Sequence, residues 1–363
     1  LAREPSFAQG TRCAGGDRAA RWISYNRILP ESVVTVVVPT LFGGEALEAC
    51  LDSLRAQTYG AFEVIVVDNS GKGVVRAGPA GQGVRVIENP RNVGFGAAVN
   101  QGWRESASRF VATLNDDARA EPGWLEALVG AMERHSDAGM CASKVLLDGE
   151  DLIDSAGMLI SADGSSKQRG HRQPAGLFGV EEEVLLPSAS AALYRRRMLD
   201  QTGGFDEDFF LYCEDTDLGL RARWAGWKCV FVPGAVVRHR YSHSAGRASS
   251  LKAYLVERNR LFLAAKDFPA ALLLAAPFAA MRRYFWHLAL MSRGRGAAAE
   301  YRSGGASAWR LPWMVLRAHL SLVANGPRLW RKRRAVRRTA TMSAAEFRAL
   351  LGRFSISPRE VAS

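Results

Sequence analysis

The sequence lacks several features that would assign it quickly to a common class of protein. Its five cysteines form no CxxC pair and no cysteine–histidine metal spacing, a pattern typical of buried thiols in a reducing compartment. No G-x-G-x-x-G motif follows the first buried strand, so the dinucleotide fingerprint is missing. The longest apolar stretch, 268–281, has 14 residues, and a membrane-spanning helix needs ~20.

A secretory signal is also missing from residues 1–32, which are polar and rich in arginine and glycine. We expect this segment to be a poorly ordered N-terminal extension. Together with the short apolar stretch, it predicts a cytoplasmic protein that touches the inner face of the plasma membrane without crossing it.

Acidic residues are scarce near the C-terminus. Between Arg282 and Arg338 there are 14 basic residues and one acid, Glu300, whereas the rest of the chain has a net charge of −1. Arginines alternate there with aromatic and apolar side chains, as in helices that lie in a membrane interface. Residues 266–363 are therefore predicted to be a basic amphipathic helical extension on an anionic membrane surface. The alternative is an extension packed on the domain that precedes it. No nucleic-acid-binding motif is present, so no nucleic-acid partner is expected.

What the sequence does contain is an alternation of strands and helices from residue 33 onward. Apolar, β-branched runs at 33–38, 62–67, 84–87 and 110–114 are typical of buried strands, and helical patterns separate them at 44–57, 94–107 and 122–135. This order predicts a doubly wound α/β sheet. The second half is less regular. We expect a loop at 161–183, a helix at 214–225 and strands at 184–194, 228–232 and 235–239.

Acidic residues end two of these predicted strands, on the side where such sheets bind ligands. The turn Asn115-Asp116-Asp117 carries two adjacent carboxylates, which repel each other unless a cation or water compensates them. Mg²⁺ or Mn²⁺ bridging a carboxylate and a diphosphate would do so, because hard cations prefer oxygen ligands. The alternative is a solvated turn that caps the helix beginning near Pro122.

Two further segments suit a nucleotide. Asp68 ends the neighbouring strand and could accept hydrogen bonds from a base or ribose. The segment from Asn92 to Asn100 places Gly94 and Gly96 at a helix N-terminus, where a backbone can approach a phosphate closely.

A third acidic cluster, Glu214-Asp215-Thr216-Asp217, opens the helix at 214–225 after an aromatic run. Three acids there could simply serve the helix dipole. A carboxylate beside apolar surface also makes a competent general base. His239 ends a predicted strand, where it is either a structural histidine or a metal ligand.

These motifs, taken in order, resemble the family 2 glycosyltransferases with the GT-A fold, most closely the rhamnosyltransferase-like branch. The resemblance covers roughly residues 33–265, the predicted catalytic domain. Its motifs are Pro39-Thr40, Val66-Val67-Asp68-Asn69-Ser70, Asn92-x-Gly94-Phe95 with Asn100 and Gly102, Leu114-Asn115-Asp116-Asp117, Gly203-Gly204-Phe205-Asp206 and Glu214-Asp215-x-Asp217-Leu218-x-x-Arg221.

The resemblance implies roles for the matched residues. Pro39, Thr40 and Asp68 would bind the nucleoside, and Asn92, Gly94 and Asn100 would line the donor pocket. Asp117 would be the principal ligand of Mg²⁺ or Mn²⁺, with Asp116 beside it and His239 as the additional ligand. Asp215 would be the base of an inverting displacement, and Glu214 is the neighbour most easily confused with it.

The sequence departs from the family pattern at two places. Leu41-Phe42-Gly43 replaces the usual aromatic-Asn pair after Pro39-Thr40, and Asn115 replaces the first acid of the metal motif. The resemblance implies a dTDP- or UDP-sugar donor, rhamnose being the expected sugar, and a glycan or lipid-linked acceptor in cell-wall or polysaccharide synthesis. Two other classes stay open at this point: a nucleotide-sugar pyrophosphorylase, and a non-catalytic basic protein bound to membrane or nucleic acid.

Overall fold

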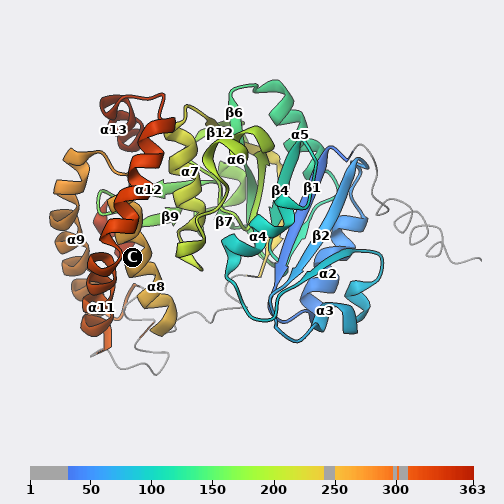
Figure 1. Cartoon of the computed structure of the whole chain (residues 1–363), viewed down its shortest axis with the longest axis horizontal. Coiled ribbons are helices and arrows are strands. Elements are labelled where there is room, and N and C mark those ends of the chain that lie inside the picture. Colours follow the sequence, from blue (N-terminus) through green and yellow to red (C-terminus); the bar gives the residue numbers. More distant parts are fainter. Residues whose placement is uncertain (1–31, 241–249, 297–300, 302–309) are drawn as a thin grey trace, which may run out of the picture.

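A computed structural model describes residues 32–240, 250–296, 301 and 310–363 of the chain. The expected N-terminal extension, 1–32, lies outside this range apart from its last residue. The described chain forms a curled sheet with helices on both faces, and a group of C-terminal helices stands at one end of it (Figure 1).

The main sheet is mixed and runs in the order β10-β12-β6-β11-β4-β1-β2-β3. The first four strands in the chain are mutually parallel, and β11 enters antiparallel between β4 and β6. The predicted α/β class with a doubly wound mixed sheet is confirmed. The strands are β1 (Val34–Thr40), β2 (Phe62–Asp68), β3 (Arg85–Glu88), β4 (Phe110–Leu114), β5 (Ala118–Ala120), β6 (Ala138–Leu147), β7 (Ile153–Ser155), β8 (Met158–Ile160), β9 (Ser166–Gln168), β10 (Glu182–Val184), β11 (Ala191–Arg195) and β12 (Lys228–His239).

Strand β1 shows why the sheet forms here. Every residue of β1 is buried, because helices cover both faces of the sheet, and a continuous β-branched run can fill both sides. Its register pairs Thr40 with Asp68 at the carboxyl end of β2. Two of the predicted site residues are therefore neighbours at the same sheet edge.

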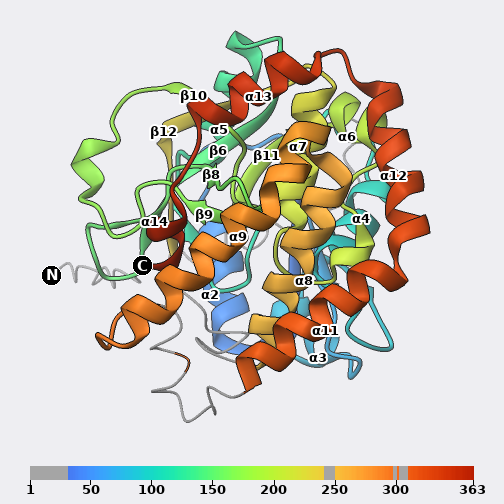
Figure 2. The same ribbon diagram turned by 90° about the vertical axis from the view of Figure 1, so that its left-hand side faces the viewer.

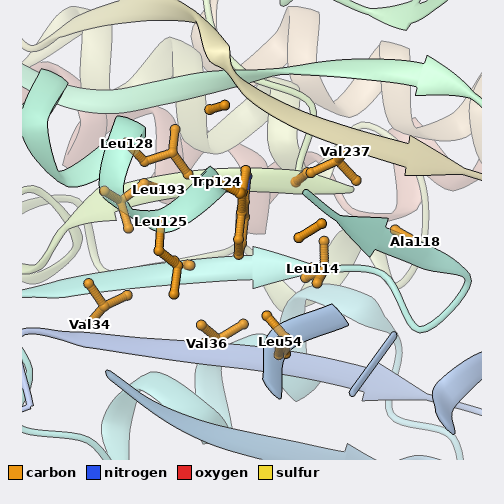
Figure 3. Packing of buried hydrophobic residues seen from close by; sticks show 14 of the residues in the cluster. Val34, Val36, Leu54, Leu114, Ala118, Trp124, Leu125, Leu128, Leu193 and Val237 are labelled. Atoms are coloured by element: carbon orange, nitrogen blue, oxygen red, sulfur yellow. The ribbon is translucent and has the colours of Figure 1, made fainter. Parts of the chain in front are cut away.

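One face of the sheet is covered by α2 (Gly44–Arg55), α3 (Val74–Ala77) and α5 (Trp124–Arg134). Figure 3 shows the indole of Trp124 in the middle of this core, among side chains from β4, β11, β12 and its own helix: Leu114, Leu193, Val237, Leu125 and Leu128. The indole N–H is buried, and it donates to Ser143 Oγ at 2.8 Å. A buried donor that finds a partner avoids the desolvation penalty.

The other face is covered by α4 (Phe95–Arg104), α6 (Arg196–Thr202) and α7 (Glu214–Trp224). Two glycines allow close packing. A Cβ on Gly102 would lie 2.5 Å from Val37 of β1, and one on Gly219 would lie 2.4 Å from Leu186. Helix α7 thus packs closely on the segment between β10 and β11, which fixes the acidic residues at its first turn.

The C-terminal helices are α8 (Ser250–Asp267), α9 (Ala270–Met291), α11 (Arg310–Ala324), α12 (Gly326–Thr339), α13 (Ala344–Arg353) and α14 (Pro358–Ala362). They share a third core with α7, in which the rings of Trp224 and Phe347 stack with their centroids 3.9 Å apart. Arg337 covers the same indole at 3.6 Å. The predicted extension is therefore packed on the catalytic domain (Figure 2). Among the described helices, none combines the length and apolarity that crossing a bilayer would require.

Four predicted elements differ from the structure. The strands expected at 228–232 and 235–239 are one strand, β12, because a register shift between Val232 and Val236 absorbs Pro233-Gly234. The strand expected at 184–194 is divided between β10 and β11. The expected loop at 161–183 contains β9, which pairs with β8, and a short helical turn at Ala175–Leu177.

Candidate active site

The acidic turn Asn115-Asp116-Asp117 lies between β4 and β5 at the carboxyl edge of the parallel strands. Its backbone is fixed at both sides: the Asn115 N–H donates to Ser190 O at 2.9 Å, and the Cys50 thiol donates to Asn115 O at 3.4 Å. The segment before β11 and helix α2 therefore both hold the backbone of this turn, which limits the directions of its side chains.

Thr40 connects the end of β1 with this turn. Its hydroxyl donates to Asp116 Oδ2 at 2.5 Å and accepts the Gly43 N–H at 3.0 Å. Asp68, the register partner of Thr40, accepts the N–H groups of Ser70 and Val75 on its two carboxylate oxygens. The predicted nucleoside residues Thr40 and Asp68 are thus adjacent to one another and, through Thr40, to the acidic turn. Pro39 is buried beside them in β1.

Asp117 and His239 meet because β5 and β12 are paired at their ends. His239 is the register partner of Ala118, and Asp117 Oδ1 lies 3.1 Å from His239 Nε2. Both side chains are buried. The two predicted metal ligands, separated by more than a hundred positions in the chain, are therefore brought together.

A third residue, Asp154 of β7, completes this arrangement and was not predicted. Its Oδ2 is 2.8 Å from His239 Nδ1, and its Oδ1 is 3.3 Å from His171 Nδ1. Asp154 is buried and is positioned by the pairing of β7 with β6, the strand beside β12. Its segment, Ile153-Asp154-Ser155, has no local pattern that would single it out.

The charge state of His239 follows from these two carboxylates. Burial lowers the pKa of the imidazole, but the contacts with Asp117 and Asp154 outweigh burial and raise it to about 10. Burial likewise disfavours the charged form of Asp154, yet His171 and His239 bring its pKa below the ordinary value. In the metal-free protein His239 is therefore a cation between two anions at neutral pH.

The donor set at Asp117 fits a divalent cation. Asp117 Oδ1 is buried and accepts no hydrogen bond of good geometry among the described residues, although it lies 3.1 Å from His239 Nε2. Such an oxygen, beside an imidazole nitrogen, is an incomplete ligand set. In the described part of the chain no group of three or more acidic, cysteine or histidine side chains is arranged so that all could hold one metal ion. Any cation held here would therefore take its other ligands from a substrate or from water.

Two consecutive residues, Ala189 and Ser190, connect Asp215 with the acidic turn. The Ala189 N–H donates to Asp215 Oδ2 at 3.3 Å, and the following residue, Ser190, accepts the Asn115 N–H. Asp215 Oδ1 also accepts the N–H of Thr216 at 2.6 Å. The predicted base is thus tied to the predicted metal turn by one short stretch of backbone.

Glu214 differs from Asp215 in its surroundings. Glu214 is buried beside Gly96 at the start of α4, and its Oε2 has no hydrogen-bond partner within the described chain, whereas Asp215 is half-buried. Burial raises the pKa of both carboxyls, and for Glu214 the charge of Asp215 adds to the effect. Asp215 is the more exposed of the two, and a raised proton affinity is what a general base requires.

The segment before α7 has an unusual backbone. Phe210, Tyr212 and Cys213 have φ values of 63°, 70° and 63°, in the left-handed region that non-glycine residues rarely occupy. The Phe210 carbonyl accepts the N–H of Phe95 at 2.9 Å, which joins this segment to the start of α4. A Cβ on Gly94 would be 2.3 Å from Phe210 O, so only glycine fits there.

Asn259 of α8 holds this segment in place. Its amide nitrogen lies 3.0, 2.8 and 2.7 Å from the carbonyl oxygens of Phe209, Leu211 and Tyr212. Asn259 is fully buried. A backbone with several strained residues persists only where contacts with the surrounding structure hold it in that conformation. Asn259 provides that support, and nothing in the local sequence indicated it.

Two of the predicted donor residues have defined local contacts. Asn92 is exposed, and its Oδ1 accepts the Gly94 N–H at 2.8 Å, which shapes the turn into α4. Asn100 is fully buried. Its amide nitrogen donates to Phe205 O and Glu207 Oε1, and its Oδ1 accepts from the Phe205 N–H and the Trp103 indole. These contacts use the hydrogen-bonding capacity of Asn100 within the protein and do not favour its predicted place in the donor pocket.

A hollow of about 400 Å³ lies elsewhere, around Arg109 and Trp227. It includes Arg195, which pairs with Phe110 at the opposite end of β4 from the acidic turn. The Arg195 guanidinium bonds the carbonyl oxygens of Ala138, Met132 and His135. This hollow is separate from the site, and Arg195 has a structural role in it.

Comparison with known proteins agrees with this geometry. Residues 35–203 match the model of the family described as Glycosyl transferase family 2. An N-acetylglucosaminyl-diphospho-decaprenol L-rhamnosyltransferase of Mycobacterium tuberculosis is 32% identical over 252 residues, which cover 61% of this chain and 81% of that protein. The uncharacterized glycosyltransferase YwdF of Bacillus subtilis is 27% identical, with coverages of 60% and 77%.

Among solved structures, the mannosyltransferase PcManGT of Pyrobaculum calidifontis, in complex with GDP-Man and Mn²⁺, aligns with a TM-score of 0.47. The alignment has 17% identity and covers 92% of this chain and 84% of that one.

The chain belongs to the family 2 glycosyltransferases. Within that family it is similar to the rhamnosyltransferase branch, as its motifs predicted, and the mixed sheet with its C-terminal helices is the expected GT-A fold. Its activity is therefore glycosyl transfer from a nucleotide sugar. This decides against the pyrophosphorylase and against the non-catalytic binding protein that the sequence left open.

Proposed function

We propose that this enzyme transfers a deoxyhexose such as rhamnose from a dTDP-sugar to a hydroxyl of a lipid-linked glycan, with inversion at the anomeric carbon. The observation that carries the proposal is the link from Asn115 through Ser190 and Ala189 to Asp215, which sets the acidic turn beside a half-buried carboxylate. The similarity to an L-rhamnosyltransferase acting on a polyprenyl-diphosphate sugar supports the choice of donor and acceptor.

In the proposed reaction Asp215 removes the proton from the acceptor hydroxyl. The oxygen then attacks the anomeric carbon, and the bond from that carbon to the donor diphosphate breaks. General-base catalysis of this kind contributes typically ~10²–10⁴-fold. The N–H groups of Ala189 and Thr216 hold the carboxylate in place, so Asp215 is oriented before the acceptor arrives.

Asp117 and His239 would hold Mg²⁺ or Mn²⁺, and that cation, when bound, supplies positive charge to the departing diphosphate. Asp154 fixes the direction of the His239 ring. Thr40 holds Asp116 at the same edge, where Asp68 and Pro39 would contact the nucleoside. Asn92 and Gly94 shape the turn into α4, which would lie along the donor.

A thermal-shift screen of nucleotide sugars, with and without Mn²⁺, tests the proposal, because a ligand that binds only the native state raises Tm. We expect dTDP-rhamnose with Mn²⁺ to give the largest increase, and Asp117→Asn to remove the Mn²⁺-dependent part. Incubation with a polyprenyl-diphosphate sugar should then release dTDP and give a product of inverted anomeric configuration by NMR. A larger Tm increase with a UDP-sugar than with dTDP-rhamnose would show that the proposed donor is wrong. A product of retained anomeric configuration would contradict the single inverting displacement.

A further inference from the structure

Helices α9 and α11 each expose an apolar stripe that the other described parts of the chain leave uncovered. The side chains are spaced three and four residues apart, so on each helix they share one face. We define them together as the docking face: Leu274, Phe278, Met281, Phe285 and Leu288 of α9, and Trp313, Leu316, Leu320 and Val323 of α11. Each is at least half exposed. Contiguous exposed apolar surface of this kind marks an interaction site.

The opposite side of α9 fixes the direction in which this face points. Arg283 is buried, donating through Nε to Asp163 Oδ2 at 2.6 Å and through a terminal nitrogen to Glu257 Oε2 at 2.8 Å. Ala276 and Ala280 are buried on the same side. The helix is thus anchored to the protein by a buried ion-pair network, and its bulky apolar side chains are turned outward.

Helix α11 is oriented in the same way. Met314 and Ala318 are buried where α11 packs along α8, so the side with Trp313 and Leu320 faces outward. Figure 2 shows α9 and α11 lying across the end of the molecule that faces the viewer. The two stripes therefore belong to one side of the enzyme.

The charges on the helices that carry the docking face, and on α12 beside α11, are of one sign. Helices α9, α11 and α12 contain no aspartate or glutamate. Their exposed charged side chains are basic: Arg282 on α9, Arg310 and Arg317 on α11, and Arg328, Arg331, Arg334 and Arg338 on α12. Two copies of this face would bring like charges together, which disfavours a symmetric dimer. An anionic lipid surface instead offers hydrocarbon to the stripe and negative headgroups to the arginines.

We propose that the docking face seats the enzyme on an anionic lipid bilayer, the inner face of the plasma membrane being the proposed location. This inference does not depend on the proposed donor or acceptor. It does connect the membrane with the site, because α11 packs on α8, and Asn259 of α8 holds the segment that leads into Asp215. A lipid-linked acceptor would then be met at the surface to which the enzyme is bound.

Flotation of the full chain with vesicles tests the docking face. We expect binding to phosphatidylcholine vesicles that contain phosphatidylglycerol, much weaker binding to phosphatidylcholine alone, and loss of binding at high salt. The double variant Phe278→Ser/Phe285→Ser should bind the anionic vesicles about tenfold or more weakly, because two exposed aromatic side chains no longer enter the interface.

A matched control is Leu177→Ser/Val180→Ser, which removes two equally exposed apolar side chains away from α9 and α11. It should bind as the wild type does. Tm and Mn²⁺-dependent hydrolysis of a nucleotide sugar in solution should be unchanged in both double variants, which separates this inference from the proposed function. Wild-type protein that fails to float, or equal binding by the two double variants, would overturn it. So would light scattering that shows a dimer without lipid which Phe278→Ser/Phe285→Ser converts to a monomer.

Discussion

The Oδ2 atom of Asp154 lies 2.8 Å from Nδ1 of His239, and this contact directs the other ring nitrogen toward Asp117. A carboxylate that binds one nitrogen of a ligating histidine fixes its tautomer and raises its basicity. Asp154→Asn should therefore weaken Mn²⁺ binding by roughly 10–100-fold, the usual effect of losing such a partner. Titration of Mn²⁺ followed by electron paramagnetic resonance measures this without any assay of activity.

Asp148→Asn is the matched control for that prediction. Asp148 follows β6 and bonds the His239 carbonyl through its own N–H, but its carboxylate pairs with Arg119 and Arg240. Its variant should keep the Mn²⁺ affinity of the wild type. Unchanged affinity in Asp154→Asn as well would show that Asp154 has only a packing role.

Asp215 and Glu214 can be separated by conservative substitution. Asp215→Asn should keep the affinity for the donor, measured by calorimetry, and should lower single-turnover transfer by ~10²–10⁴-fold, the usual contribution of a general base. Glu214→Gln removes a buried carboxyl with an unpartnered oxygen, so it should affect transfer far less. The reverse order of the two effects would assign the base to Glu214.

Gly94 is expected to be intolerant of any side chain. Its φ is +91°, and a Cβ would lie 2.3 Å from the Phe210 carbonyl oxygen, so Gly94→Ala should destabilise the protein by about 2 kcal/mol or more and should also impair transfer. Gly123→Ala is the control, because no atom lies within 4 Å of a Cβ there and its φ is −89°. Urea unfolding of the two variants checks the difference; equal losses would contradict the steric argument.

The ion pairs that anchor α9 predict a dependence of stability on pH. Burial opposes ionisation of Glu257, but Arg283 and Arg260 outweigh it and lower its pKa to about 2 from an ordinary 4.5. A lowered pKa means that the unfolded state binds the proton first, so this stabilisation is complete above pH 4.5 and declines as the pH falls toward 2. In urea unfolding between pH 7 and pH 3, Glu257→Gln should be less stable at pH 7 and should show a smaller decline than the wild type. Parallel pH curves would rule out this contribution.

The stack between Trp224 and Phe347 makes the C-terminal helices part of the catalytic unit. Phe347 is fully buried, and Phe347→Ala should lower the free energy of unfolding by about 3–5 kcal/mol, as for other buried aromatic residues. The exposed Phe285 should give a change within about 0.5 kcal/mol when replaced by alanine. Calorimetry or urea unfolding compares the two. A small loss for Phe347→Ala would mean that the extension is only loosely attached.

Much of the first half of the fold could be predicted, because its strands are continuous apolar runs and their order follows from the helices between them. Asp117 and Asp215 were recognisable from motifs within a few residues. Asp154 and Asn259 were not, because each acts on a residue from a distant element and neither has a local pattern. The same applies to β8 and β9, which pair in a polar region where Ile160 also bridges to Ser355 near the C-terminus.

The extension shows the limit of composition as a guide. Its net charge predicted an anionic partner, but it could not separate the arginines that face outward from those that bind other groups of the protein. Arg283 and Arg337 are internal: one is bound to Asp163 and Glu257, and the other covers Trp224. Only the packing of the helices decides which positive charges are available to a partner.

Asn259 holds the backbone before Asp215, and this has a consequence for the folding of the enzyme during its synthesis. During synthesis β1, β2 and β4 leave the ribosome first, and β1 can pair with β2, which carries Asp68, and with β4, which precedes the turn of Asp117. The turn into α7 lacks the three contacts of Asn259 until α8 has emerged, and Trp224 lacks its stacking partner until Phe347 follows. In a nascent chain Asp68 and Asp117 would therefore be in place before the turn that leads into Asp215. A ribosome that stalls before α8 would leave that turn without the contacts of Asn259.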